Sequence, residues 1–416
     1  LGVGFIGAGF NGNFHARAWV GVRDADIRAI CDPNLERANS LADTCRQLKI
    51  GDPKVYADAG DMVADPAVDA VWLNAPNYTR IPIMESISRT IQDGKGKLTG
   101  IACEKPLGRN FKEAQQMYDM IKELEIPHGY LENQVFAPSL VRGREISWGR
   151  GASVTGRPYL ARCAEEHSGP HEPWFWTGSQ QGGGALNDML CHSVEAARYL
   201  LTKPGDSKNT LKPKTISAEI GSLKWSRPEY IKILKEMSNG EVDYSKAPAE
   251  DFAKATIVFE TPEGHPAVIE VTSSWSFVGP GLRLSFEMLG PEYYMQVNTL
   301  APELYVFLSR AVSGAEGEDM VEKQNAEGGL MPVMPNEELS YGYTDEDRHM
   351  VQSFLEGKMP NETWEDGLIV AQLLAHCYYS SEQGKKVAFE PGNLESFIPA
   401  VAKGTWKPSS IFQAGK

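Results

Sequence analysis

Three glycines with the spacing Gly7-x-Gly9-x-x-Gly12 constrain the fold of this chain more than any other feature of its sequence. They follow a short apolar strand over 3–6 and precede a helix that we expect to begin near Asn13. Gly7 permits a tight turn, Gly9 lets a pyrophosphate approach the backbone, and Gly12 lets the helix lie close to the strand. The start of such a helix offers N–H groups and a partial positive charge to phosphates. The segment therefore predicts a dinucleotide-binding loop.

An acidic residue at the end of the second strand supports this prediction. The strand 27–32 ends in Asp32, about 20 residues after the last glycine, where a carboxylate accepts hydrogen bonds from an adenosine ribose. A carboxylate there also repels a 2′-phosphate, so we expect NAD as the cofactor rather than NADP. Arg37, five residues further on, keeps NADP open as the second choice, because a nearby arginine accommodates that phosphate in some proteins.

Strands and helices alternate throughout the first 131 residues. The expected strands after Asp32 cover 68–76, 98–106 and 126–134, and the expected helices cover 34–45, 82–92 and 111–124. This order predicts an α/β domain over 1–131 with a doubly wound parallel sheet of the Rossmann type. Ligands bind outside the carboxyl ends of the strands in such sheets, which is where Asn74, Pro76 and Lys105 fall.

The pattern changes in the remainder of the 416 residues. Long runs with alternating apolar residues predict antiparallel strands over 255–264, 267–277, 283–290 and 292–298. We therefore expect a second domain of the α+β class over 132–416, built on an open, mainly antiparallel sheet. Surface loops are expected over 203–214 and 312–340, and amphipathic helices over 345–357 and 364–383.

Composition excludes several classes of protein. The net charge of −14 is spread along the chain, which argues against a nucleic-acid partner. No run of about 18 apolar residues exists, so no membrane span is expected. The six cysteines form no CxxC pair, which is typical of free thiols in a reducing compartment, and we expect a cytoplasmic protein. Because Leu1 already lies in an apolar strand, we also expect a few residues ahead of it, where an export signal would lie.

The stretch "GGGALNDMLCH", residues 182–192, places glycines before an Asp and a His. The apolar spacing predicts a helix over 186–201, so Asp188 and His192 would stand one turn apart on the same face. The glycines would leave room for a flat sugar or nicotinamide ring at the helix start. A surface pair of Asp and His is the alternative from these residues alone.

The aromatic segment 165–176, "EEHSGPHEPWFW", precedes these glycines. His167, Trp174 and Trp176 could form a wall on which a sugar ring stacks, and an aromatic loop packed over the sheet is an equal alternative. A metal site with His171 is disfavoured, because two histidines separated by Gly-Pro cannot lie on one helix face. We therefore predict no metal.

Taken together, these motifs resemble the Gfo/Idh/MocA family of NAD(P)-dependent oxidoreductases. The matching motifs are GxGxxGxxH at 7–15, Asp32, "NAPN" at 74–77, "EKPL" at 104–107 and GGG-x₃-D-x₃-H at 182–192. The resemblance implies that Lys105, Asp188 and His192 line the substrate pocket. Two departures are Arg80, where many members have His, and the long segment 88–100, expected as an enlarged loop.

The motifs and the resemblance together predict the following contacts. Cofactor contacts are expected at Gly7, Gly9, Phe10, Asn11, Gly12, Asp32, Arg37, Asn74, Pro76, Asn77, Glu104 and Lys105. Substrate contacts are expected at Lys105, Asn133, His167, Trp174, Trp176, Asp188 and His192. His15 is expected near the phosphates at the helix start rather than in catalysis.

The predicted reaction is oxidation of a secondary hydroxyl of a sugar, glycoside or cyclic polyol, or reduction of the corresponding ketone. Oxidation needs a base for the hydroxyl proton, for which His192 is suited because imidazole titrates near neutrality. Asp188 would orient His192 or hold a neighbouring hydroxyl of the substrate. Lys105 would stabilise the developing alkoxide or act as the base itself, and both assignments stay open. Hydroxy acids fit less well because a carboxylate favours an arginine clamp.

Two other functions share the predicted cofactor site. A glycosidase that uses tightly bound NAD as a transient oxidant would return the hydride in each cycle. A sensor that binds NAD(H) without turnover would not need Lys105 and His192, so their presence disfavours it. We further expect a homo-oligomer, dimer or tetramer, formed through the open face of the second sheet.

Overall fold

The computed structural model describes residues 1–309, 320–324 and 328–408, which form two compact units. The first unit contains 1–138 and 338–371, and the second contains 139–337 and 372–416. This division differs from the predicted boundary between 131 and 132. The chain returns to the first unit because helix α12 (Tyr343–Leu355) packs into the core of that unit.

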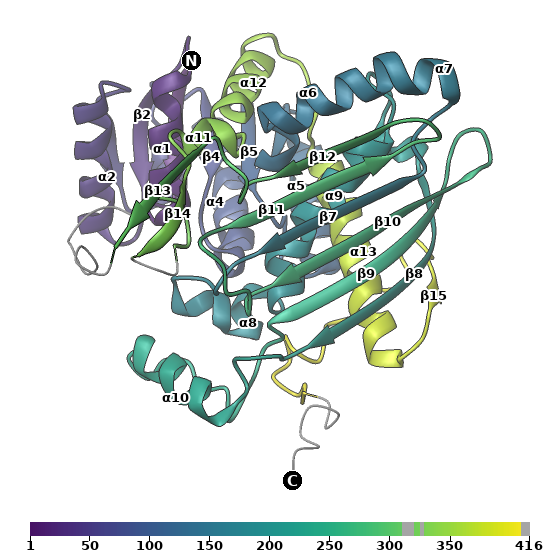
Figure 1. Ribbon diagram of the computed structural model, residues 1–416. Helices are drawn as coiled ribbons and strands as arrows, with labels where there is room; N and C mark the ends of the chain where they lie inside the picture. The colour runs from purple at the N-terminus through teal and green to yellow at the C-terminus, as the bar shows by residue number, and fades with distance from the viewer. Residues whose placement is uncertain (310–319, 325–327, 409–416) are drawn as a thin grey trace. The chain divides into compact units, whose positions relative to one another are not determined.

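The first unit is built on a parallel sheet whose strand order is β3-β2-β1-β4-β5-β6. Its strands β2, β4 and β5 are labelled in Figure 1. All five neighbouring pairs are parallel. The strands are β1 (Gly2–Ile6), β2 (Asp26–Cys31), β3 (Lys54–Tyr56), β4 (Ala70–Leu73), β5 (Gly100–Glu104) and β6 (His128–Leu131). The predicted doubly wound sheet is confirmed. The strand order reverses between β1 and β4, and this reversal opens a crevice at their carboxyl ends.

Helices cover this sheet, with α1 packed on α2 and α12, and α4 packed on α3 and α5. They are α1 (Phe10–Ala18), α2 (Leu35–Leu48), α3 (Ala59–Val63), α4 (Arg80–Gln92) and α5 (Phe111–Leu124). Because α4 continues to Gln92, only 93–99 of the expected enlarged loop lies between helix and strand. Two strand glycines admit α12: a Cβ at Gly100 would lie 2.3 Å from the Phe354 ring, and one at Gly129 would lie 2.4 Å from the Met350 sulfur.

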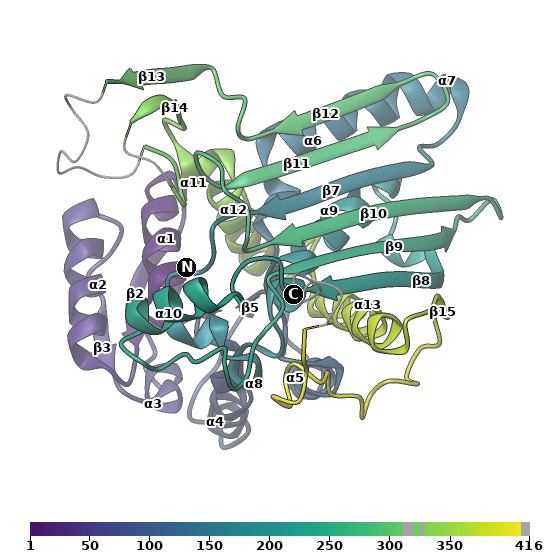
Figure 2. The same cartoon turned by 60° about the horizontal axis from the view of Figure 1, so that its bottom comes forward.

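The second unit is built on a seven-stranded sheet with the order β12-β11-β7-β10-β9-β8-β15. Only β7 and β10 pair in parallel, so the predicted mainly antiparallel sheet is confirmed. The strands are β7 (Leu160–Glu166), β8 (Lys212–Gly221), β9 (Phe252–Glu260), β10 (Pro266–Ser274), β11 (Arg283–Leu289), β12 (Tyr294–Asn298) and β15 (Val387–Ala388). Helix α9 (Cys191–Leu201) packs on one face, and the strands lie side by side across it (Figure 2).

The helices not yet named are short, apart from α13. They are α6 (Pro138–Ile146), α7 (Ser153–Thr155), α8 (Gly178–Gln181), α10 (Pro228–Met237), α11 (Glu337–Ser340) and α13 (Trp364–Gln383). The loop predicted over 312–340 is partly wrong, because β14 (Gly329–Val333) pairs with β13 (Leu304–Leu308). Residues 310–319 and 325–327 of that region lie outside the described residues.

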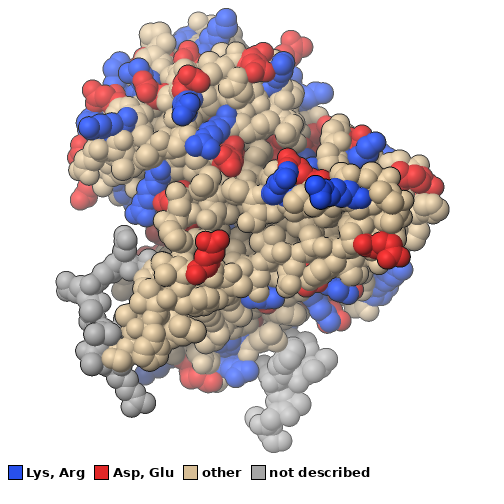
Figure 3. Space-filling view, turned by 45° about the horizontal axis from the view of Figure 1, so that its top comes forward, with Lys and Arg blue, Asp and Glu red and all other residues tan. Residues whose placement is uncertain are grey.

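Charges of both signs are interspersed on the face drawn in Figure 3, and neither sign forms a continuous patch there. Many of the exposed charges are paired locally, as Arg46 is with Asp43 and Asp52. Within the described part of the chain, no helix combines the length and the apolar character needed to cross a membrane.

Candidate active site

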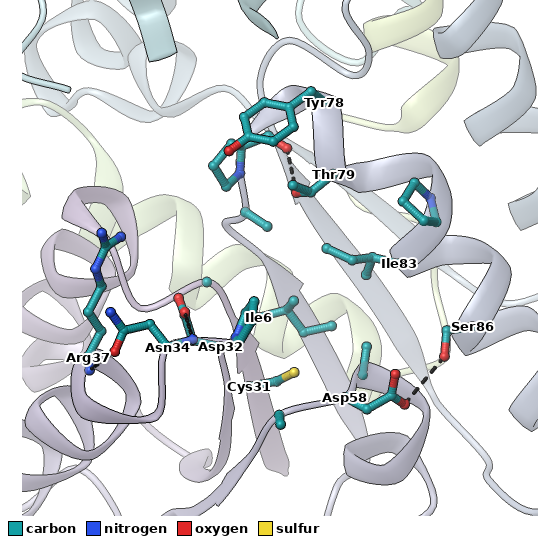
Figure 4. Close-up of a pocket in the computed structure, with 17 residues that line it drawn as sticks. Ile6, Cys31, Asp32, Asn34, Arg37, Asp58, Tyr78, Thr79, Ile83 and Ser86 are labelled. Atoms are coloured by element: carbon teal, nitrogen blue, oxygen red, sulfur yellow. Dashed lines mark hydrogen bonds between the residues drawn. The ribbon is translucent and has the colours of Figure 1, made fainter. Parts of the chain in front are cut away.

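A pocket of about 890 Å³ opens at the carboxyl ends of β1, β2 and β4 in the first unit. Four of the residues predicted to contact the cofactor line it: Gly7, Asp32, Arg37 and Pro76. Figure 4 shows Asp32 and Arg37 on the wall formed by β2 and α2, opposite Tyr78 on the segment that follows β4. The pocket thus lies at the reversal point of the strand order, where dinucleotides bind in sheets of this kind.

The glycine loop has the backbone geometry that its sequence predicts. Gly7 has a φ of +100°, and a Cβ there would lie 2.8 Å from the backbone nitrogen of Ala75. A Cβ at Gly12 would lie 2.3 Å from the Gly7 oxygen, whereas Gly9 faces open space. Helix α1 begins at Phe10, earlier than expected, so Phe10, Asn11 and Gly12 form its first turn. No side chain caps this helix start, which suits it to a phosphate.

Asp32 supports the glycine loop from within. Its Oδ2 accepts a hydrogen bond from the Ala8 amide at 2.9 Å, and its Oδ1 accepts one from the Asn34 amide at 2.8 Å. A carboxylate has about four acceptor positions, so two remain for a ribose. Arg37 is exposed in the first turn of α2, whose start is capped by Asn34.

Asn74, which directly follows β4, is the strongest sign of a ligand in this unit. Its side chain is only 8% exposed, and neither its amide nitrogen nor its amide oxygen has a hydrogen-bond partner. Buried amides are rarely left in that state, because the loss of hydrogen bonds to water is not repaid. Asn77 is buried nearby in the short helical turn 77–79. The open space at Gly9, the helix start without a side-chain cap and this amide together fit a bound dinucleotide.

Glu104 and Lys105 stand at the end of β5, but Glu104 is turned into the interior. Its Oε1 lies 3.1 Å from Nε2 of His15, and its Oε2 accepts a hydrogen bond from the Lys105 amide at 3.0 Å. Burial would raise the pKa of Glu104, but the bond and charge of His15 and the nearby cations outweigh it and lower that pKa. The Glu104 carboxylate therefore bonds within the protein, and a contact of Glu104 with the cofactor stays a prediction.

The side chain of His15 also bonds within the protein. His15 is fully buried, and its Nδ1 lies 2.9 Å from Oδ1 of Asp347 on α12. The Trp72 indole donates to the same oxygen at 2.8 Å. Burial opposes a charge on the imidazole, but Asp347 and Glu104 outweigh it and raise the pKa of His15 to about 10. His15 therefore lies in the interior between two carboxylates, and its predicted place near the phosphates stays a prediction.

Asp188 and His192 lie in the second unit, in one helical segment as predicted. Asp188 falls in a π-helical turn over 186–190, and His192 falls in the first turn of α9. Both side chains are 4% exposed. Asp188 accepts a hydrogen bond from the Trp275 indole at 3.1 Å, and Nε2 of His192 lies 3.9 Å from a carboxylate oxygen of Glu165. π-helical turns occur frequently at functional sites.

Trp275 and Glu165 were not predicted as partners of this pair. Glu165 lies at the carboxyl end of β7, and its negative charge forms an ion pair with His192 whenever the imidazole is protonated. The only signal in the sequence was a buried-strand pattern that ends in two glutamates. Trp275 directly follows β10. Nothing in the sequence indicates that its indole contacts Asp188.

Two of the three glycines before Asp188, Gly183 and Gly184, lie against other parts of the protein. A Cβ at Gly183 would lie 1.8 Å from the Tyr378 hydroxyl, and one at Gly184 would lie 2.2 Å from the Glu250 backbone oxygen. The Glu250 carboxylate accepts hydrogen bonds from the Gly184 amide, the Leu186 amide and the Tyr378 hydroxyl at 2.8, 3.1 and 2.6 Å. Gly183 and Gly184 therefore do not leave the predicted room for a sugar or nicotinamide ring.

Glu250 should make the stability of the protein depend on pH. Burial raises the pKa of Glu250 to about 7, although the bonds from Tyr378 and the two amides act in the opposite direction. The folded state therefore holds this proton more tightly than the unfolded chain does, and the stabilisation present at low pH is lost as pH rises from about 4.5 to 7. The expected contribution is about 3 kcal/mol.

The measurement is urea unfolding of the wild type and of Glu250→Gln between pH 4 and 8. The difference between the two curves should grow across that window, because glutamine does not titrate. The exposed Glu229→Gln variant should follow the wild type at every pH. Parallel curves for wild type and Glu250→Gln would remove Glu250 as the cause.

The aromatic segment before the glycines is mostly packed inside the second unit. Trp176 is 3% exposed, and its ring makes edge-on or tilted contacts with Trp225, Tyr244 and Trp275. Its indole N–H donates to the Pro170 carbonyl. The predicted stacking wall does not hold for Trp176, because its ring belongs to this core.

Trp174 and His167 differ from Trp176 in exposure and contacts. Trp174 is partly exposed and stacks on Phe175, with ring centroids 3.8 Å apart. His167 is buried, and its Nδ1 accepts a hydrogen bond from the Gly169 amide. In the first unit, the Asn133 amide donates to the Tyr341 carbonyl at 2.7 Å. These three residues stay predicted substrate contacts.

Two parts of the chain match families of known proteins. Residues 1–127 match the family GFO_IDH_MocA, described as "Oxidoreductase family, NAD-binding Rossmann fold". Residues 152–292 match GFO_IDH_MocA_C3, the GFO/IDH/MocA C-terminal domain. The first match covers the pocket and the glycine loop, and the second covers Asp188 and His192.

Individual proteins are similar over shorter stretches. The rhizopine catabolism protein MocA of Rhizobium meliloti is 28% identical over 240 residues, which cover 57% of this chain and 68% of that protein. The levoglucosan dehydrogenase of Pseudarthrobacter phenanthrenivorans is 30% identical over 213 residues, or 48% of this chain, and the match spans about half of its length, 51%.

A solved structure extends the likeness to nearly the whole fold. The crystal structure of GenD2 from gentamicin A biosynthesis, in complex with NAD, has a TM-score of 0.72 and 24% identity, covering 94% of this chain and 96% of that one. With both of its parts matched, in the order found here, the chain belongs to the Gfo/Idh/MocA family of oxidoreductases, and its first unit contains the NAD-binding Rossmann domain of that family.

Proposed function

We propose that this protein oxidises a secondary hydroxyl of a sugar, glycoside or cyclic polyol with NAD, or reduces the corresponding ketone. The observation that carries the proposal is the pocket at the carboxyl ends of β1, β2 and β4, beside which the Asn74 amide is buried without a partner. The similarity to a levoglucosan dehydrogenase supports a carbohydrate as the substrate.

The cofactor would be held by residues that line or border this pocket. The Gly7–Gly12 loop and the start of α1 would take the pyrophosphate, and Asp32 would take the adenosine ribose. Asn74 would receive the polar groups that its amide lacks in the protein. Bound NAD supplies the acceptor for a hydride.

Three side chains would act on the substrate. His192 would take the hydroxyl proton, with Glu165 and Asp188 setting its orientation and charge. Lys105 would stabilise the alkoxide that forms or take the proton itself. Trp174 remains the one tryptophan proposed to contact a sugar ring, because it is partly exposed.

The proposal is tested by offering sugars, polyols and glycosides with NAD and following the nicotinamide absorbance. Steady accumulation of NADH with a sugar or polyol supports a dehydrogenase. Glycoside cleavage without NADH accumulation would favour a glycosidase that uses NAD transiently, and NAD binding without either reaction would favour a sensor. Faster turnover of hydroxy acids than of any carbohydrate contradicts the substrate class.

Asp32 should decide the choice between NAD and NADP. Asp32→Ala is expected to weaken NAD about tenfold or more while weakening NADP less, because both the ribose bonds and the repulsion of a 2′-phosphate are lost. Steady-state kinetics with each cofactor measure the ratio. Asn34→Ala, which removes the α2 cap but not the carboxylate, is the control. A wild type that prefers NADP would refute the assignment.

Two further properties are proposals of the same kind. The polar open face of the seven-stranded sheet, which includes Lys254 and Glu270, is proposed to pair with a second copy of the chain in a dimer or tetramer. The six cysteines are all buried free thiols, which supports a reducing compartment such as the cytoplasm.

A further inference from the structure

Arg80, the first residue of α4, is buried at the carboxyl ends of two strands, with 2% of its surface exposed. Its Nε donates to the Ala75 carbonyl at 3.0 Å. One Nη donates to the carbonyls of Glu104 and Pro106, and the other donates to the Lys105 carbonyl at 3.2 Å. One guanidinium therefore holds four backbone oxygens.

These four oxygens lie where the hydrogen bonding between the two strands stops. The ladder of β4 and β5 ends at the pair Leu73 and Cys103, so the residues beyond it have no strand partner from that ladder. Buried carbonyl groups need such partners. Arg80 supplies them with the planar fork of N–H groups that only arginine has.

Lys105 is consequently held on both sides of its Cα. Its amide donates to the Glu104 carboxylate at 3.0 Å, and its carbonyl accepts from Arg80. Ala75, two residues after the end of β4, lines the dinucleotide pocket and leaves no room for a side chain at Gly7. The same guanidinium therefore joins the wall of the cofactor pocket to the backbone that carries Lys105.

We infer that Arg80 is a positioning residue for Lys105, which fixes the lysine backbone relative to the pocket wall at Ala75. This inference rests on the proposed function, in which Lys105 acts on the substrate. Displacement of a reacting group by about 1 Å can lower a rate by about 100-fold. Loss of Arg80 should therefore affect turnover more than it affects binding of NAD.

The test uses Arg80→Ala and Arg80→Lys in the full-length protein. We expect kcat to fall about 10- to 100-fold in both variants, with the KM for NAD within about threefold of the wild type. Arg80→Lys should not retain the wild-type kcat, because a single ammonium cannot donate to all four carbonyl groups. Low-millimolar guanidinium chloride should restore part of kcat in Arg80→Ala, and sodium chloride at equal concentration should not. Arg109→Ala, which removes an arginine paired with Glu113, is the matched control and should show no rescue.

A double substitution identifies the residue through which Arg80 acts. If Arg80 positions Lys105, then Arg80→Ala should lower kcat little further in a Lys105→Met background. An equal loss in both backgrounds would overturn the inference, as would an Arg80→Ala variant with normal kcat. A loss of NAD binding and of kcat together, without rescue, would reduce Arg80 to a general structural role.

A failure of the proposed function can be separated from a failure of this inference. If the wild type oxidises no carbohydrate, the proposed function fails, and hydrogen exchange then measures the clamp directly. Arg80→Ala should speed exchange of the Lys105 amide at least tenfold relative to Arg109→Ala. Unchanged exchange at that amide would overturn the inference by a route that does not depend on turnover.

Discussion

Replacement of His192 with alanine is expected to lower kcat about 100- to 10,000-fold, the usual contribution of a general acid or base. The affinity for NAD should stay near the wild-type value, because the dinucleotide pocket is lined entirely by residues of the first unit. Stopped-flow measurement of NADH formation gives the rate, and quenching of protein fluorescence gives the affinity. The exposed His265→Ala variant should behave as the wild type does.

Lys105→Met, measured beside His192→Ala, decides between the two proposed bases. The variant that lacks the base should lose the fall in rate at acidic pH that protonation of the base causes. The other variant should keep that fall, with a lower maximal rate. Turnover within threefold of wild type in either variant would exclude that residue from the chemistry. Glu165→Gln should shift the pH of that fall if the carboxylate acts through His192.

Gly184→Ala is expected to cost about 3 kcal/mol of the free energy of unfolding or more. The added Cβ would lie 2.2 Å from the Glu250 backbone oxygen and 2.7 Å from its carboxylate, so a backbone segment would have to move. Urea unfolding measures the loss. Gly149→Ala, at an exposed site with nothing within 4 Å of the new Cβ, should leave stability unchanged or raise it by up to about 1 kcal/mol.

Comparison with Gly149→Ala separates the close contact at Gly184 from the general effect of replacing a glycine. Glycine-to-alanine substitution alone changes the entropy of the unfolded chain, and both variants share this effect. A Gly184→Ala protein as stable as Gly149→Ala would mean that the close approach of Glu250 is not needed in the folded state.

Local patterns were sufficient to predict the first sheet. The strand β1, the loop at Gly7 and the acid at Asp32 are adjacent or nearly adjacent in sequence, and each has one physical explanation. The start of α1 was misplaced because Gly12 was interpreted as preceding the helix. Its position in the first turn, 2.3 Å from the Gly7 oxygen for an added Cβ, shows that glycine can serve close packing inside a helix.

Long-range partners could not be predicted in the same way. Whether Trp176 forms a wall or a core depends on Trp225 and Trp275, which lie 49 and 99 positions further along the chain. Residues 182–184 were interpreted as space for a ligand because Glu250 and Tyr378 could not be placed beside them from the sequence. Periodicity identifies a helix or strand, but it does not identify what packs against it.

The return of α12 to the first unit has a consequence for how this protein can be recombined with its relatives. A chimera that took only 1–138 from this chain would receive β5 and β6 without Phe354 and Met350, which pack over Gly100 and Gly129. It would also keep His15 and Glu104 but lose Asp347, the second carboxylate that contacts His15. Exchange of the cofactor-binding half between family members therefore requires two crossovers more than a simple head-to-tail fusion, so that 338–371 travels with 1–138.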